Sequence, residues 1–214
     1  MKRIASFIRI LFLALFLSLL ANGKASLWLV LFTVSLIAAL FVGRVYCGYV
    51  CPMNTLMIPV EWLSKKLKLQ TSNIPKWLRN GYVPWIALVA SVAVMLLSKK
   101  LLQIQLPILP FWMVVALLVT LRYKPAVFHN LICPFGALQK TFGRFARFSK
   151  KVNQGACIGC KLCEKACPSN AVVVSAVDHK AEINPALCHQ CINCTLACPK
   201  TAIHYDKKQA GSQR

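Results

Sequence analysis

Charged side chains are missing from long stretches of this chain. Its 214 residues include only five acidic side chains, and four apolar runs contain no ionisable side chain. Apolar runs that approach about 20 residues exclude a small soluble protein and predict helices that cross a membrane. We expect four such spans, at residues 10–20 with their flanks, 27–42, 83–97 and roughly 104–121.

The chain also lacks a glycine-rich nucleotide loop and an evident catalytic nucleophile. These absences argue against a complete enzyme and favour a subunit of a larger complex. The surplus of 26 Lys and Arg residues does not indicate nucleic-acid binding, because these residues flank the apolar runs.

Basic residues predict the orientation of the spans. All but Lys24, Lys99 and Lys100 precede the first span, lie between the second and third, or follow the fourth. By the positive-inside rule, we expect both termini of this multi-pass protein to be cytoplasmic. The first span could instead be a cleaved signal peptide. Against this, Arg9 lies well inside the segment, and Lys24 lies at the expected cleavage site, where small residues are typical.

Eight of the eleven cysteines form one motif written twice, C-x2-C-x2-C-x3-C-P. The first three cysteines wrap around one 4Fe–4S cubane, whereas the fourth points its sulfur to the other cubane. Zinc or disulfides fit this register poorly, since zinc pairs CxxC with CxxC. We therefore expect two 4Fe–4S clusters. The first would take Cys157, Cys160, Cys163 and Cys198, and the second Cys188, Cys191, Cys194 and Cys167.

A second pair of motifs follows the second and fourth spans. Cys47-Gly-Tyr-Val-Cys51-Pro and His129-Asn-Leu-Ile-Cys133-Pro occupy equivalent places in two helix hairpins, which predicts a weak internal repeat. Three thiolates and one imidazole can bind zinc or a cluster. The alternative is that these small, polarizable cysteines simply pack against neighbouring helices.

Titratable side chains at a similar predicted depth are candidates for proton transfer in quinol oxidation. His129 has a suitable pKa in its unperturbed state, and Tyr46, Glu61 and Tyr123 are further candidates. In contrast, His189 is expected to be exposed, because Cys188 and Cys191 already bracket it.

The predicted fold is an α-helical membrane protein with four transmembrane helices in two hairpin repeats, plus a small α+β two-cluster bacterial ferredoxin domain. The membrane domain would span residues 1–150, the ferredoxin domain 151–206 and a disordered tail 207–214. Strands are expected at 171–174, 181–183 and 202–205, and an amphipathic surface helix at 58–69. The aromatic and basic stretch 142–148 would hold the ferredoxin domain against the bilayer.

These features together resemble the NapH/MauN family of membrane-anchored ferredoxins, which shares motifs with NosR-type polyferredoxins. The resemblance covers nearly the whole chain, including the four spans, the motif C-G-Y-V-C-P and the two cytoplasmic clusters. Where the family's second motif has Cys-x3-Cys-Pro, this chain begins it with His129. The flavin-binding domain of the larger regulators is also missing.

The resemblance implies a membrane-bound electron-transfer protein. It would relay electrons through two 4Fe–4S clusters at the cytoplasmic face, linked to the quinone pool and a partner reductase, as a possible component of a quinol dehydrogenase. The alternative is a maturation or regulatory factor that supplies electrons for assembly of a periplasmic metalloenzyme.

Overall fold

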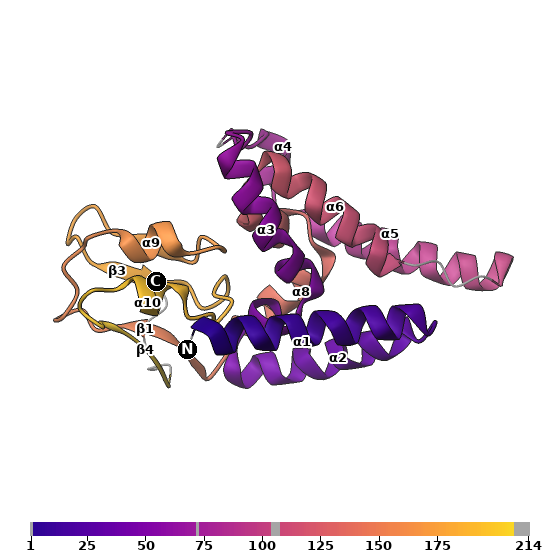
Figure 1. Cartoon of the computed structure of the whole chain (residues 1–214), viewed down its shortest axis with the longest axis horizontal. Coiled ribbons are helices and arrows are strands. Elements are labelled where there is room, and N and C mark those ends of the chain that lie inside the picture. The colour runs from indigo at the N-terminus through magenta and orange to yellow at the C-terminus, as the bar shows by residue number, and fades with distance from the viewer. Residues whose placement is uncertain (1, 72, 104–107, 208–214) are drawn as a thin grey trace.

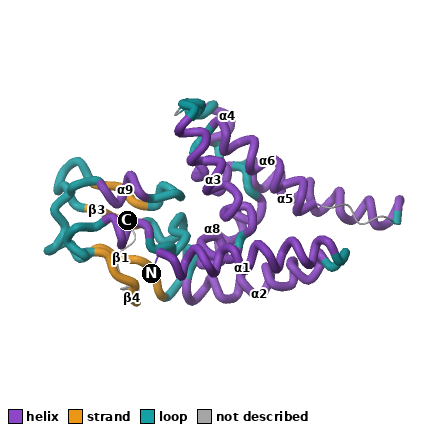
Figure 2. The backbone as a smooth tube through the Cα atoms, in the orientation of Figure 1, coloured by secondary structure: helices purple, strands orange, loops and turns teal. Residues whose placement is uncertain are grey.

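The computed structural model describes residues 2–71, 73–103 and 108–207. Two helical arms extend in the same direction, and a small domain of short strands and loops lies at the opposite end of the molecule (Figures 1 and 2). A base of short helices joins the three parts.

The first arm is an antiparallel hairpin of α1 (Lys2–Ala21) and α2 (Ala25–Val42). The turn between them contains Gly23 at φ 67°, a left-handed conformation that costs glycine little. Trp28 anchors the hairpin, because its buried ring packs edge-on against Phe16 at 5.1 Å between centroids.

The second arm contains α5 (Val83–Leu97), a π-helical continuation η2 (Ser98–Leu102), and α6 (Ile108–Arg122). Within the described residues, three helices are long and apolar enough to cross a membrane, at residues 2–21, 25–42 and 83–101. Helix α6 is apolar but shorter. The first four residues of the expected fourth span, 104–107, lie outside the described part, so that span stays a prediction.

The base is formed by the segments that follow each arm. After the first arm come a π-helical turn η1 (Tyr46–Val50), α3 (Pro52–Lys66) and α4 (Lys76–Arg79); after the second come α7 (Pro125–Leu131) and α8 (Pro134–Gly143). The helix expected from residue 58 thus begins at Pro52. The cause is the Cys51-Pro52 step, because extended Cys51 caps a helix in which proline takes the first position.

The two motifs of the base share one local geometry. Cys51 has φ −64° and ψ 118°, and Cys133 has φ −65° and ψ 118°. Each is followed by a proline that opens a helix. The backbone is therefore nearly identical at the two positions that the sequence pairs.

The small domain consists of two antiparallel strand pairs and two short helices. Strand β1 (Phe148–Val152) pairs with β4 (Ile203–Lys207), and β2 (Val172–Val174) pairs with β3 (Ala181–Ile183). Helices α9 (Leu162–Ala166) and α10 (Asn193–Ala197) follow the cysteine loops. The three expected strands are confirmed within one or two residues at their ends.

Strand β1 was not expected. It begins at Phe148, the last residue of the aromatic stretch that we assigned to the membrane surface. The first two residues of that stretch end α8, and residues 144–147 lie between the helix and the strand. Lys207 ends β4, and the rest of the expected tail lies outside the described residues.

Candidate iron–sulfur sites

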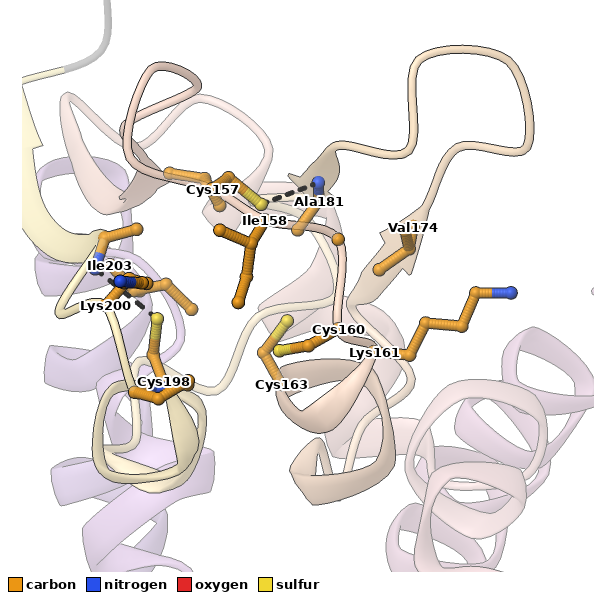
Figure 3. Close-up of a pocket in the computed structure, with 14 residues that line it drawn as sticks. Cys157, Ile158, Cys160, Lys161, Cys163, Val174, Ala181, Cys198, Lys200 and Ile203 are labelled. Carbon is orange, nitrogen blue, oxygen red and sulfur yellow. Dashed lines mark hydrogen bonds between the residues drawn. The ribbon is translucent and has the colours of Figure 1, made fainter.

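The first four predicted ligands surround one cavity. Cys157, Cys160, Cys163 and Cys198 all line it, and their sulfur atoms point toward a common space (Figure 3). The remaining wall is mostly apolar, with Val174 and Ile203 among its residues. The structure therefore brings Cys198, from the second motif, to the cysteines of the first, as the crossed assignment requires.

Backbone amides are directed at the sulfur atoms of this site. The N–H of Ala181 donates to Cys157 Sγ at 3.5 Å, and that of Ala202 donates to Cys198 Sγ at 3.4 Å. Gly159, at φ 68°, lets the loop approach the backbone oxygen of His179, where a Cβ atom would not fit. Donors of this kind suit a charged sulfur ligand.

The second group of predicted ligands shows the reciprocal crossing. The pKa of Cys188 is raised to about 12 and that of Cys194 to about 11, chiefly by burial, and nearby Cys167 contributes to both increases. Cys167 also raises the pKa of Cys191. Thiols influence each other in this way only at short range, so Cys167 lies with the cysteines of the second motif.

The two motifs match in detail beyond their spacing. The N–H of Ala171 donates to Cys167 Sγ at 3.2 Å, and the N–H of Ala202 donates to Cys198 Sγ at 3.4 Å. In both motifs the donor lies four residues after the fourth cysteine, and the third cysteine lies in a short helix, Cys163 in α9 and Cys194 in α10.

The donor chemistry fits iron–sulfur clusters. In the described part of the chain, no three Cys, His, Asp or Glu side chains are arranged to hold a single metal ion. A cubane is larger than one ion and keeps its ligands further apart, so thiols around a common cavity suit it. Buried thiols with raised pKa values ionise only beside positive charge, which iron supplies when bound.

The two sites have opposite surroundings. In the first, Cys160 is exposed and Cys157 is half-buried, whereas the three cysteines Cys188, Cys191 and Cys194 of the second motif are all buried. The second site is covered by the helical base. Arg9 Nε donates to the backbone oxygen of Gly48 at 2.9 Å beside it.

The prediction that His189 is exposed is wrong. Only 1 % of His189 is accessible, and its ring packs edge-on against the ring of His129 at 4.9 Å between centroids. Its backbone oxygen lies so close to Gly48 that a Cβ atom there would not fit. The cysteine motif itself gives no sign of this contact, because the partner residues come from the helical base.

The three cysteines of the base lie close together and are buried. Burial raises the pKa of Cys51, and Cys47 and Cys133 raise it further. The pKa of Cys133 is raised to about 12, chiefly by burial. Cys133 Sγ accepts a hydrogen bond from the N–H of Gly136 at 3.3 Å.

His129, the fourth residue of that predicted group, contacts the rings of Phe128 and His189. Burial, and then Arg44, lower its pKa to about 3, and its Nε2 has no hydrogen-bond partner among the described residues. The imidazole is therefore neutral near pH 7 and has a free ring nitrogen.

The other proton-transfer candidates are separated. Tyr46 is buried and its hydroxyl accepts a hydrogen bond from Trp28 Nε1 at 2.8 Å. Glu61 pairs with Lys65 at 2.6 Å, and Tyr123 is half-buried. Within the described residues, no hydrogen bond joins Glu61 or Tyr123 to the cysteines of the base.

Arg44 was missed by sequence reasoning and is fully buried at the junction. Its Nη1 donates to the backbone oxygen of Ala186 at 3.2 Å and to Asn130 Oδ1 at 3.5 Å, while Nη2 lies 3.8 Å from Cys47 Sγ. Asn130 continues the link, because its Nδ2 donates to Ser169 O at 2.8 Å. Such polar contacts fix the small domain on the base.

Two sequence profiles match the chain. The profile described as a 4Fe-4S binding domain matches residues 25–70 and 105–153, and the profile described as a 4Fe-4S dicluster domain matches residues 156–203. The first match therefore includes the three cysteines of the base, and the second includes all eight cysteines of the repeated motif.

Similar proteins carry matching names. The ferredoxin-type protein MauN of Methylobacillus flagellatus is 29% identical over 158 residues, which are 66% of this chain and 54% of MauN. The ferredoxin-type protein NapH of Haemophilus influenzae is 28% identical over 151 residues, 65% of this chain and 53% of NapH. This chain belongs to the NapH/MauN family.

A protein without either name is also similar to this chain. An uncharacterized protein of Methanocaldococcus jannaschii is 30% identical over 150 residues, which cover 68% of this chain and 59% of that protein. The match thus spans little more than half the length of these relatives. No solved structure matches the chain. As a NapH/MauN protein, the chain is an iron–sulfur protein of the electron-transport type with apolar helices suited to a membrane.

Proposed function

We propose that this protein relays single electrons through two 4Fe–4S clusters at the cytoplasmic face of the bacterial inner membrane, between the quinone pool and a partner reductase. The observation that carries the proposal is the crossed arrangement of the eight cysteines. Cys198 lines the cavity of the first motif, and Cys167 lies with the cysteines of the second. When bound, each cubane would accept and release one electron.

The proposed ligands divide by surroundings into an outer and an inner set. Cys157, Cys160, Cys163 and Cys198 would hold the outer cluster, which is open to solvent at Cys160. The inner cluster would lie against the helical base, held by Cys188, Cys191, Cys194 and Cys167. This order suits a relay, because one end faces the membrane part and the other faces away from it.

The proposed membrane topology has four spans in two hairpin repeats, with α6 as the fourth span. The equal backbone angles at Cys51 and Cys133 support the repeat. In this scheme residues 1–150 form the membrane domain, residues 151–206 the ferredoxin domain and residues 207–214 a tail. The placement of basic residues supports a cytoplasmic ferredoxin domain within a larger redox complex.

An apolar cavity between α5 and α6 supports a link to quinone. Its volume is about 470 Å³, within the range of small-molecule sites, and Phe111 and Trp112 line it. From Trp112, ring contacts continue to Phe128 at 6.5 Å, to His129 at 5.7 Å and to His189 at 4.9 Å. His189 adjoins Cys188, so packed rings connect the cavity with the inner cluster.

The thiols of the base are a further proposed metal site, with Cys47, Cys51, His129 and Cys133 as its ligands. An iron–sulfur cluster suits them better than a single ion, because no three such side chains among the described residues are arranged to hold one ion. The closeness of the three thiols and the free Nε2 of His129 support it. Fully packed thiols without metal are the alternative, since all three are buried.

The test is anaerobic purification in detergent, with iron and zinc counted per chain and EPR spectra recorded before and after addition of a quinol analogue. We expect about eight irons and a quinol-induced cluster signal. Trp112→Ala should slow the quinol reaction, whereas the control Trp77→Ala, at a 64 % exposed residue of α4, should not.

Two results would count against the proposal. Fewer than eight irons in protein that keeps all eleven cysteines would contradict two cubanes. Eight irons without any response to quinol would favour the maturation factor instead. Additional iron or zinc, lost in Cys51→Ala, would establish a metal site in the base.

A further inference from the structure

The ferredoxin domain has an exposed apolar centre beside the outer cluster site. Cys160 is exposed there, and Ile158 and Leu162 on either side of it are 59 % and 45 % accessible. Ile158 and Cys160 line the same cavity as the other three cysteines of that site (Figure 3). We name Ile158, Cys160 and Leu162 the outer face.

Lysines surround the outer face. Lys161 and Lys200 line the same cavity and are exposed, and Lys165 lies one helical turn after Lys161. The acid beside them, Glu164, is half-buried, and within the described residues none of the three lysines forms an ion pair with it or with any other carboxylate. The outer face therefore has an apolar centre and a rim with positive net charge.

The inner cluster site differs, since the base already covers its cysteines. An electron that enters or leaves the protein on the side away from the base must pass the outer face. The ferredoxin domain also lies at the end of the molecule opposite the tips of the two arms (Figure 1). A partner protein can approach that end without contacting the arms.

We propose that the outer face is the docking site for a redox protein that presents an acidic surface around its own cofactor. This inference rests on the proposed relay and names the chemistry of its partner. Charge complementarity identifies the partner, because Lys161, Lys165 and Lys200 would attract carboxylates while Ile158 and Leu162 exclude water. When held by Cys157, Cys160, Cys163 and Cys198, a cluster would supply one electron, which the partner's oxidised cofactor would accept.

The experiment uses the full-length protein in nanodiscs of zwitterionic lipid, with its clusters reduced by dithionite. The probes are the acidic soluble domain of cytochrome b5 and basic cytochrome c, both with ferric haem. Stopped-flow absorbance would give the second-order rate constant for haem reduction. We expect the acidic probe to react faster at low salt and to lose this advantage as salt rises.

Charge reversal provides the decisive variant. Lys161→Glu with Lys200→Glu should lower the rate constant of the acidic probe by about tenfold or more and raise that of the basic probe. Lys76→Glu with Arg79→Glu makes the same change in net charge on α4, where both residues are exposed, and should leave both rate constants nearly unchanged.

Several outcomes would overturn the proposal. Equal effects of the two variants would mean that total charge, and not the outer face, controls the reaction. An effect of charge reversal that appears only in anionic nanodiscs would assign the lysines to lipid headgroups. Iron content and EPR of each variant keep these results separate from failure of the relay, since dithionite reduces the clusters without quinol.

Discussion

One cysteine motif occurs twice in this protein, and the two copies have opposite surroundings. The outer site is open at Cys160 and bordered by exposed lysines, whereas the inner site is buried beneath the base with His189 at its side. Burial, nearby charge and hydrogen bonds to sulfur all tune the reduction potential of a cluster. Identical ligand spacing therefore does not make the two sites equivalent.

The charges near each site also differ in how well water screens them. Lys161 and Lys200 are exposed, so solvent and salt weaken their effect on the outer site. Arg44, at the junction with the inner site, is fully buried and lies among groups with little access to water. The same unit of charge should thus act more strongly on the inner cluster.

Removing one ligand from each site should have the largest effect. Cys160→Ala and Cys191→Ala should each lower the iron content from about eight to about four per chain, since each removes one cubane. We expect only Cys191→Ala to loosen the ferredoxin domain from the base, detected as faster limited proteolysis. Equal proteolysis of both variants would contradict the difference between the sites.

Acid should destabilise the residues around His129 in α7 before it destabilises β2 and β3. The pKa of His129 is lowered to about 3, so the unfolded chain binds this proton before the folded chain does. Stability present above pH 6.5 is therefore lost as pH falls, by about 2 kcal/mol at pH 5 from this residue alone. Hydrogen exchange at pH 7 and pH 5 should show loss of protection around α7 before β2 and β3.

The control for this prediction is His129→Gln, which cannot take up the proton. Its exchange should change less between the two pH values. If the variant and the parent protein respond equally to acid, the effect comes from elsewhere, for example from the clusters themselves.

A methyl group at Gly48 should disturb the junction. The added Cβ of Gly48→Ala would collide with the backbone oxygen of His189, which cannot move without shifting the inner loop. We expect a loss of about 1–3 kcal/mol in unfolding free energy. Gly155→Ala is the matched control, because its Cβ would meet only Asn153 Oδ1 at 3.4 Å. Comparable chemical denaturation of both variants would refute the close contact.

Removing one charge near each site should have the smallest effect. Arg44→Met should make the inner cluster harder to reduce by about tenfold, or ~59 mV for one electron, and Arg44→Lys should restore most of this. Lys161→Met should shift the outer cluster less, since that charge is screened. EPR-monitored redox titration measures both, and a larger shift for Lys161→Met would reverse the comparison.

The ferredoxin strands were predictable because their signals are local. Val172–Val174 is a short β-branched run, and Ala181–Ile183 alternates apolar and polar side chains; turns flank both. The spacing of the motif also led us to expect Cys198 beside Cys157, Cys160 and Cys163, and the four do line one cavity. The full assignment of ligands to two clusters stays a prediction. Helix starts at Pro52 and Pro134 follow the same local chemistry.

The junction could not be predicted, because its contacts join residues far apart in the sequence. His189 meets His129, and Arg44 meets Ala186, through packing that no local pattern specifies. In the sequence, Arg44 indicated only the membrane orientation, as one of many basic residues beside a span. Strand β1 could not be predicted for a related reason. By sequence alone, Phe148 and its neighbours resemble a membrane-surface segment, and they form a strand by pairing with the distant β4.

The attachment of the ferredoxin domain to the first arm has one further consequence. Tyr205 Oη donates to Val42 O at 3.0 Å, and the N–H of Arg147 donates to Leu40 O at 3.2 Å. Strand β4 and the residue before β1 are therefore both tied to the last turn of α2. A domain held at the end of a helix in this way does not move between an electron donor and an electron acceptor. Electrons would cross a constant distance. That distance, and not domain motion, would set the rate of electron transfer.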